Sequence, residues 1–326
     1  MAHRRGRASG PHGDVARPAL RRRVWAIVNR RAGAARRDVA TPLALAALFA
    51  AHGLEAEVTV VPSTRAVRAA AAAAARRGAR LVVAVGGDGT IAAAASALVG
   101  TETTLGIVPA GTMNNLAHGL GVPTDPGRAA ALIASGEACP IDVGTIRSSA
   151  DPRERYFFET AGVGITALAA PFGEAIHRGR WRRALGRLGE LARAPGTRMR
   201  VEFDGDTLFA DTQLVAASNA PRVGPRAAFA PGAVMDDGLL DVALFAGMTK
   251  AALAVYFVSA MLGHPLPAPR VGVRRARRVV VLPAQPRPAT ADLRVLPAAD
   301  RWEIGVLPGG VQVIVGGGAA LRGRAN

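Results

Sequence analysis

The first part of the chain alternates short apolar runs with longer helical patterns. The apolar runs with the length of buried strands are Val24–Val28, Glu57–Val61, Leu81–Val85 and Thr104–Val108. The helical patterns between and after them are Val39–His52, Arg65–Arg77, Ile91–Leu98 and Leu116–Leu120. Strands that alternate with helices in this way predict an α/β domain built on a parallel sheet with crossover helices.

Beyond Cys139 the pattern changes to alternating, strand-like segments. These are Tyr156–Thr160, Arg198–Phe203, Thr212–Ser218, Leu240–Phe245, Arg278–Leu282, Trp302–Val306 and Val311–Val315. One helical stretch, Ala175–Arg193, interrupts them, and the whole predicts a second, mainly β and sandwich-like domain. We therefore expect a disordered basic tail over 1–23, a nucleotide-binding α/β domain over 24–137 and a β-rich domain over 138–316. Residues 317–326 are candidates to complete the α/β domain.

Charge narrows the choice of partners without fixing it. The chain has 41 basic and 24 acidic residues, a net charge of +17. Such a field attracts nucleic acid, anionic lipid headgroups or phosphorylated ligands, and a compositional bias toward Arg and Ala is an alternative explanation. Only 4% of residues are aromatic, and no basic stretch alternates with stacking residues. This argues against nucleic-acid binding.

Cysteine content and apolar run length indicate the compartment. A single cysteine, Cys139, excludes an intrachain disulfide and suits a reducing cytoplasm. The arginine-rich first 23 residues lack the apolar core of a signal peptide. The longest apolar runs, near Leu43–Ala51 and Ala251–Leu262, fall below the roughly 18 to 20 residues that span a bilayer as a helix. We therefore expect a cytoplasmic protein, with contact to a membrane surface left open.

The segment LVVAVGGDGT, residues 81–90, places an acid among three glycines directly after a buried strand. Ligands collect at the carboxyl ends of parallel strands, and glycines let backbone N–H groups approach phosphates closely. Gly86, Gly87 and Gly89 fit that role. A carboxylate beside phosphates needs Mg²⁺ between them, so Asp88 is a candidate metal-side acid. The alternative is a tight turn in which Asp88 caps the following helix.

A second turn, PAGTMNNLAHGLG at 109–121, follows the next predicted strand. Its candidate site residues are Gly111, Thr112, Asn114 and Asn115. Taken alone, GTMNN is typical of a helix N-cap. Because neighbouring parallel strands end at the same edge of a sheet, we expect both turns to line one crevice.

With these motifs in place, the sequence resembles the diacylglycerol kinase catalytic-domain superfamily, which includes sphingosine kinases and is distantly related to NAD kinases and phosphofructokinases. The motifs that carry the resemblance are Asn29 with Gly33, GGDGT at 86–90, LGIVPAGTMNNLAHGLGVP at 105–123, IDVG at 141–144 and FAPGAVMDDGLLDVALF at 229–245. Their order and spacing cover nearly the whole chain after Arg23.

The resemblance implies an amino-terminal ATP-binding domain, a β-rich second domain and a lipid-headgroup site between them. It places Gly86–Thr90 on the ATP phosphates, Asn29 and either Ser63 or Thr64 beside the nucleotide, and Gly111–Asn115 at the edge of the pocket. ATP and Mg²⁺ are the implied cofactors. The reaction needs a base near the acceptor hydroxyl and cations facing the developing charge.

Two positions depart from the family's pattern. Near the carboxy terminus the family carries Asp-Gly-Glu, whose Asp is the proposed base, and here Asp292-Leu293-Arg294 takes that place. The similar Asp204-Gly205-Asp206 is better interpreted as a hairpin turn. Family members also place an acid three residues before an Asp-Gly pair, as part of a structural metal site. Here that earlier position holds Val234. Either Asp236 compensates for it, with Asp237 and the main chain of Leu239 as metal ligands, or Asp237 only supports a turn.

The stretch AIHRGRWRRALGRLGELAR, within the predicted helix at 175–193, combines an apolar stripe with a basic face. This suits a helix lying on anionic lipid, and a helix packed on its own protein is the alternative. The histidines have no metal-ligand spacing, so we expect no zinc site. A homodimer is a candidate assembly.

We conclude that the sequence predicts an ATP-dependent lipid kinase acting on a diacylglycerol-like or sphingoid lipid, peripheral to the inner face of the membrane. Asp88 would organise Mg²⁺ and phosphates, and Asp292 would deprotonate the acceptor. The alternatives are a catalytically weakened nucleotide- or lipid-binding homologue, or a soluble kinase of NAD or another small alcohol.

Overall fold

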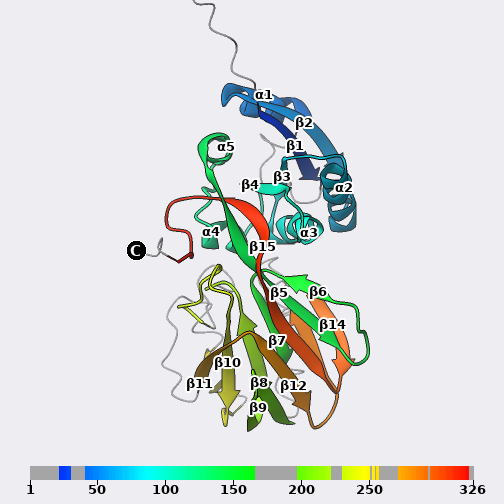
Figure 1. The fold of residues 1–326 in the computed structure, drawn as a ribbon, viewed down its shortest axis with the longest axis vertical. Helices are drawn as coiled ribbons and strands as arrows, with labels where there is room; N and C mark the ends of the chain where they lie inside the picture. The colour runs from blue at the N-terminus through cyan, green and yellow to red at the C-terminus, as the bar shows by residue number, and fades with distance from the viewer. Residues whose placement is uncertain are drawn as a thin grey trace, which may run out of the picture.

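The computed structural model describes residues 22–30, 41–165, 197–221, 230–249, 252–253, 255–256, 271–292 and 294–322. It has an amino-terminal α/β domain and a β-rich, sandwich-like domain, as the sequence predicts (Figure 1). Gly33, the predicted helix at 175–193 and Leu293 lie outside the described residues. Within the described part of the chain, no helix combines the length and hydropathy needed to cross a bilayer.

The α/β domain has a parallel sheet with strand order β4-β3-β1-β2. Its strands are β1 (Arg22–Asn29), β2 (Leu54–Val61), β3 (Leu81–Gly86) and β4 (Thr104–Pro109). The helices are α1 (Pro42–Ala51), α2 (Thr64–Arg76), α3 (Asp88–Leu98), α4 (Asn115–Gly119) and α5 (Pro126–Ser135). The predicted alternation of strands and helices is confirmed.

Helix α5 is an addition to the predicted elements. Its start carries two ordinary signals, because Asp125 accepts a hydrogen bond from the Arg128 N–H at 2.8 Å and Pro126 occupies the first turn. Ala129, Ala130 and Ile133 bury its inner face. The helix therefore forms for local reasons that the apolar pattern alone did not reveal.

The β-rich domain contains antiparallel pairs throughout. Its strands are β5 (Glu137–Ser148), β6 (Arg155–Phe157), β7 (Thr160–Gly164), β8 (Thr197–Phe203), β9 (Asp206–Ser218), β10 (Leu240–Ala246), β11 (Val271–Ala276), β12 (Arg278–Pro283), β13 (Arg287–Ala291), β14 (Arg294–Ala299) and β15 (Trp302–Val315). The predicted hairpin at Asp204-Gly205 is confirmed between β8 and β9, where both residues have positive φ.

Two long strands, β5 and β15, run from one domain into the other (Figure 1). Ile146 and Ile304 lie in the core of the β-rich domain, whereas Ile141 and Val313 lie in the core of the α/β domain. At its far end β15 pairs in parallel with β4 through Val313. The two domains therefore share one continuous sheet.

Strand β15 also corrects one prediction. The segments expected as separate strands, Trp302–Val306 and Val311–Val315, form a single strand whose register shifts between Leu307 and Val311. The shift coincides with Gly309-Gly310, where φ of Gly309 is +59°. The glycines thus produce an irregularity within one strand and do not end it.

Candidate nucleotide and catalytic site

The two glycine-bearing turns meet at the carboxyl ends of β3 and β4. The Ala110 N–H donates to the Gly86 carbonyl at 2.9 Å. A Cβ added at Gly111 would lie 2.4 Å from Gly87 Cα, so the backbones touch where any side chain would separate them. The structure therefore brings the predicted loops together.

The GGDGT turn is also tied to the end of β1. Asn29 Nδ2 donates to Thr90 Oγ1 at 3.0 Å, and both residues are buried. A Cβ at Gly86 would come within 2.6 Å of Thr90 Cβ. Asn29 and Thr90 thus act inside the protein as supports for the turn. Gly87, Asp88 and Gly89 are more exposed.

The other predicted nucleotide residues lie beside these turns. Ser63 caps α2, since its Oγ accepts from the Ala66 N–H at 3.3 Å. Thr64 is exposed, and its methyl carbon lies 3.8 Å from the position of a Cβ at Gly89. Of the two candidates, Thr64 has the freer side chain facing the GGDGT turn.

Asn114 shapes the second turn. Its φ is +50°, in the left-handed region, and its side chain exchanges hydrogen bonds with Gly111: Oδ1 accepts from the Gly111 N–H and Nδ2 donates to the Gly111 carbonyl, both at 2.9 Å. Asparagine tolerates this conformation better than most residues. Thr112 remains exposed at the tip of the turn.

Asp88 points from the first turn toward the second. Gly87 holds the N-cap position of α3 and makes no side-chain cap. The Asp88 Oδ1 accepts from the Leu116 N–H at 3.3 Å. Burial raises the pKa of the Asp88 carboxyl, and backbone N–H groups of the second turn partly oppose that rise. Asp88 therefore connects the two loops and does not cap its own helix.

Asp292 is held by a break in a predicted strand. The expectation of one strand over Tyr156–Thr160 is wrong, because β6 ends at Phe157 and β7 begins at Thr160. The N–H groups of Phe158, Glu159 and Thr160 donate to the Asp292 carboxylate at 2.8 to 3.2 Å. The chain turns there because these donors face Asp292 and not a neighbouring strand.

The conformation of Asp292 itself is unusual. Its φ is +49°, and its own N–H donates to the Thr160 carbonyl at 2.8 Å, so the two segments hold each other. Burial raises the pKa of Asp292 to about 6, although three backbone donors favour its charged form, and the charge of Asp88 adds to the rise. Asp88 and Asp292, which the sequence predicted as site residues from two distant motifs, therefore belong to one site.

Glu159 completes this group of acids, and sequence reasoning missed it. Only 6% of the residue is exposed, and its Oε2 accepts from Asn115 Nδ2 at 2.9 Å. Burial and the charges of Asp292 and Asp88 raise its pKa well above the ordinary value. The signal in the sequence is an acid within the apolar stretch YFFETAGVG, since a glutamate is almost never fully buried unless it is paired. We call Asp88, Glu159 and Asp292 the acid trio.

The acid trio lacks a positive partner among the described residues, where no ion pair involves any of its members. Nor do three acidic, histidine or cysteine groups of the described chain lie close enough together to hold a metal ion by themselves. Mg²⁺ commonly takes one or two carboxylates from a protein and its other ligands from phosphates and water. Asp88, between the two phosphate-type loops, fits that chemistry.

The second expected metal position has a different environment. Asp237 Oδ1 accepts from the Leu239 N–H at 3.0 Å, and an Arg275 nitrogen lies 3.3 Å from its other oxygen. Asp142, in the IDVG motif, accepts from the Gly238 N–H at 2.6 Å. These bonds define a turn neutralised in part by Arg275. The metal role of Asp237 and Leu239 stays a prediction.

Comparisons with known proteins agree with this arrangement. The family model for the diacylglycerol kinase catalytic domain matches residues 23–146, and that for the YegS C-terminal NAD kinase beta sandwich-like domain matches residues 160–315. A diacylglycerol kinase of Mycobacterium tuberculosis is 31% identical over 239 residues, which cover 72% of this chain and 76% of the relative. A probable YegS-like lipid kinase of Xanthomonas oryzae is 30% identical over 257 residues, covering 74% and 81%.

Solved structures agree on the fold. A putative diacylglycerol kinase from Bacillus anthracis superposes with a TM-score of 0.70 at 20% sequence identity, over 90% of this chain and 95% of the other. At this identity the likeness establishes architecture alone. Together with the curated relatives, it shows that the chain belongs to the diacylglycerol kinase catalytic-domain family of lipid kinases.

Proposed function

We propose that the protein is an ATP-dependent kinase that transfers the γ-phosphoryl group to a hydroxyl of a diacylglycerol-like or sphingoid lipid. One observation carries the proposal. The acid trio, raised in pKa and without a cationic partner among the described residues, lies beside two turns whose glycine backbones touch at Gly87 and Gly111. A nucleotide with Mg²⁺ supplies the missing positive charge and the matching phosphates.

The two turns bind the nucleotide in this proposal. Glycine at positions 86, 87, 89 and 111 lets the main chain of the turns approach the phosphates, and the Asn29–Thr90 hydrogen bond fixes the geometry of the first turn. Ser63 or Thr64, with Thr112, Asn114 and Asn115, borders the pocket. Asp88 would hold Mg²⁺, which would neutralise phosphate charge.

Asp292 takes the proton of the acceptor hydroxyl. Its Oδ1 accepts from three backbone N–H groups, whereas Oδ2 accepts from only one, that of Phe158. Oδ2 therefore keeps a lone pair for the substrate. With a pKa of about 6 the carboxyl is mostly ionised at neutral pH and still basic enough to assist. The alkoxide oxygen then bonds to the γ-phosphorus as the bond to ADP breaks.

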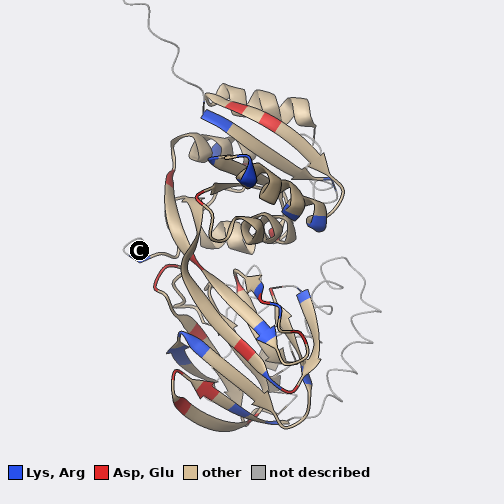
Figure 2. Cartoon of the chain, turned by 45° about the vertical axis from the view of Figure 1, so that its right-hand side comes forward, with Lys and Arg blue, Asp and Glu red and all other residues tan. Residues whose placement is uncertain are grey.

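A lipid acceptor places the enzyme at the cytoplasmic face of the membrane as a peripheral protein. The names of the relatives support a lipid acceptor, and the net charge of +17 supports attraction to anionic lipid. Figure 2 shows basic residues distributed over both domains.

A second candidate function is a nucleotide- or lipid-binding protein with weakened catalysis. The observation that favours it is Arg294, which stands where the family carries a glutamate. Binding of ATP without any lipid phosphorylation would support this candidate over the kinase.

The test is to incubate the purified protein with labelled ATP, Mg²⁺ and a total lipid extract, and to identify the labelled product. We expect a phosphorylated lipid, and we expect Asp88→Ala to lower its formation by about 10²- to 10⁴-fold with the fold intact by circular dichroism. Unchanged turnover in that variant would refute the role of Asp88. Label appearing only in a water-soluble product would refute the lipid acceptor.

A further inference from the structure

Glu159 is bonded to both halves of the candidate site. Its side chain contacts the second glycine-bearing turn, since Asn115 Nδ2 donates to Glu159 Oε2 at 2.9 Å. We call this contact the Glu159–Asn115 bond. The main-chain N–H of Glu159 donates to Asp292 Oδ1 at 2.8 Å, which is shorter than the bonds from Phe158 and Thr160. One residue thus links a loop of the α/β domain to the proposed base.

The main chain of Glu159 is also fixed on its carbonyl side. The Glu159 carbonyl accepts from the Asn219 N–H at 2.9 Å and from the Ala220 N–H at 3.1 Å, just after the end of β9. Asn219 also donates from Nδ2 to the Phe158 carbonyl at 3.2 Å. A shift of the Glu159 side chain that carries the backbone with it therefore moves the donor to Asp292 against these bonds.

Asn115 is fixed in a similar way on the α/β side. It is the first residue of α4 and follows Asn114, whose side chain exchanges hydrogen bonds with Gly111. The next residue, Leu116, donates from its N–H to Asp88 Oδ1 at 3.3 Å. The second turn and Asp88 therefore set the position of Asn115.

Burial makes the Glu159–Asn115 bond costly to lose. Only 6% of Glu159 and 4% of Asn115 is exposed. A buried amide N–H that loses its acceptor is unfavourable, because water does not readily replace the partner. The strands β5 and β15 join the domains through the sheet, whereas this bond joins the two loops of the site directly.

We propose that Glu159 is a positioning residue that sets the place of Asp292 relative to the nucleotide-binding turns. Its side chain holds the second turn and its N–H holds the base, so the two keep a fixed separation. Phosphoryl transfer needs the acceptor oxygen close to the γ-phosphorus and in line with the leaving group. The inference rests on the proposed function, because it gives Glu159 a role within that reaction.

The experiment compares two substitutions of Glu159 with a matched control. Glu159→Met keeps the length of the side chain and the main-chain N–H but removes the acceptor oxygen, whereas Glu159→Gln keeps an acceptor for Asn115. The control is Thr212→Val, because Thr212 is 3% exposed and its Oγ1 donates to the Phe245 carbonyl at 2.9 Å, between β9 and β10. The control thus removes a buried hydrogen bond that lies outside the site motifs.

The expected result is a split between kcat and KM. We expect Glu159→Met to lower kcat by about 10²-fold, with KM for ATP and the affinity for a non-hydrolysable ATP analogue changed by less than about threefold. Glu159→Gln should recover about tenfold of that loss, because it restores the bond to Asn115. Thr212→Val should lower Tm and leave kcat of the folded protein unchanged. If Glu159→Met behaves like Thr212→Val, or if Glu159→Gln recovers nothing, the inference is overturned.

A double-mutant cycle tests the bond itself. If Glu159 acts through Asn115, the variant that combines Glu159→Met with Asn115→Ala should have about the same kcat as Glu159→Met alone. Losses that multiply would show that the two residues act independently, and would overturn the inference.

Amide hydrogen exchange tests the link without any turnover. We expect Asn115→Ala to speed exchange of the Phe158–Thr160 amides by about tenfold in the ligand-free protein, and Thr212→Val to leave it unchanged. Wild-type exchange rates at these amides in Asn115→Ala would overturn the link. If the wild-type protein forms no phosphorylated lipid, the proposed function fails, and faster exchange in Asn115→Ala would still support the connection between the second turn and Asp292.

Discussion

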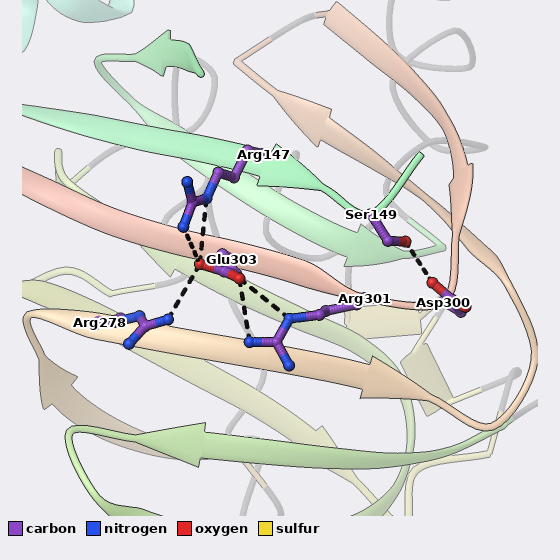
Figure 3. Close-up of polar contacts among 6 residues, drawn as sticks. All are labelled: Arg147, Ser149, Arg278, Asp300, Arg301 and Glu303. Carbon is purple, nitrogen blue, oxygen red and sulfur yellow. Dashed lines mark hydrogen bonds and ion pairs between the residues drawn. The ribbon is translucent and has the colours of Figure 1, made fainter. Parts of the chain in front are cut away.

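Carboxyl groups meet opposite surroundings in two regions of this protein. On the outer face of the β-rich domain, Glu303 is bonded by Arg147 at 2.6 Å and by Arg278 and Arg301 at 3.1 Å (Figure 3). These arginines lower the pKa of Glu303 to about 2. At the junction of the domains, burial raises the pKa of every member of the acid trio, and neighbouring acidic charges add to the rise for Glu159 and Asp292.

Under the proposed function, the difference separates a structural acid, Glu303, from the acids of the candidate site. Arg147, Arg278 and Arg301 neutralise Glu303 from within the chain. Its bonds therefore support cross-strand packing between β5, β12 and β15 and need no ligand. The acid trio is held by backbone N–H groups and Asn115, without a cation among the described residues. A buried acid left in that state is a frequent mark of a site completed by an external ligand.

The largest expected contrast is in turnover. Asp292→Asn keeps an oxygen for the backbone donors of Phe158–Thr160 but removes the proton acceptor. We expect kcat to fall by about 10²- to 10⁴-fold in a labelled-ATP assay, with a small change in stability. Glu303→Gln, assayed beside it, should retain wild-type kcat. Equal activity of Asp292→Asn and the wild type would show that another group accepts the proton, and Glu159 would be the next candidate.

The next contrast is in the pH dependence of stability, where the two regions have opposite signs. The pKa of Asp292 is raised in the folded protein from 3.8 to about 6, so its contribution is fully present below about pH 4 and is lost as pH rises through 6. The pKa of Glu303 is lowered from 4.5 to about 2, so its contribution is present above about pH 4.5 and is lost as pH falls toward 2.

Chemical unfolding of wild type, Asp292→Asn and Glu303→Gln between pH 3 and 7 measures both effects. Relative to Asp292→Asn, the wild type should gain about 1–3 kcal/mol as pH falls from 7 to 4.5. Relative to Glu303→Gln, it should lose stability below pH 4.5. If the free energy of unfolding changed with pH in the same way for all three proteins, the two regions would not differ in their electrostatics as stated.

The smallest effect concerns the Glu303 network itself. Glu303→Gln removes the charge that Arg147, Arg278 and Arg301 share, and it leaves their mutual repulsion. Because these arginines are largely exposed, solvent screens them, and we expect a loss of about 1 kcal/mol. That corresponds to a fall in Tm of about 2 °C, measured by calorimetry. A loss of kcat in this variant would contradict its assignment as structural.

Much of the α/β domain and its loops followed from the sequence. Apolar runs ending in GGDGT and PAGTMNN predicted where strands stop and where phosphates would bind, because glycine and asparagine requirements are local. The contact between Gly87 and Gly111 then needed only that β3 and β4 be neighbours. Helix α5 shows the limit of apolar patterning. Its start is signalled by Asp125 and Pro126, which are capping residues and do not belong to an apolar pattern.

The β-rich part of the site was less predictable. The break between β6 and β7 arises from the hydrogen bonds between Asp292 and Phe158–Thr160, residues more than 130 positions away. Alternation of apolar residues gives no hint of such a partner. For the same reason Glu159 escaped notice, because its neighbours Asn115, Asp88 and Asp292 come from other elements.

The sequence by itself determined the family, the order of the domains and the two glycine-bearing loops that meet at the sheet edge, since each depends on residue types at short spacing. Only the tertiary structure decided which acids lie together, which of them have arginine partners, and that β5 and β15 join the domains into one sheet. The physical reason is the separation along the chain over which each effect acts. Backbone preferences act over a few residues, whereas burial and charge act between any residues that the fold brings into contact.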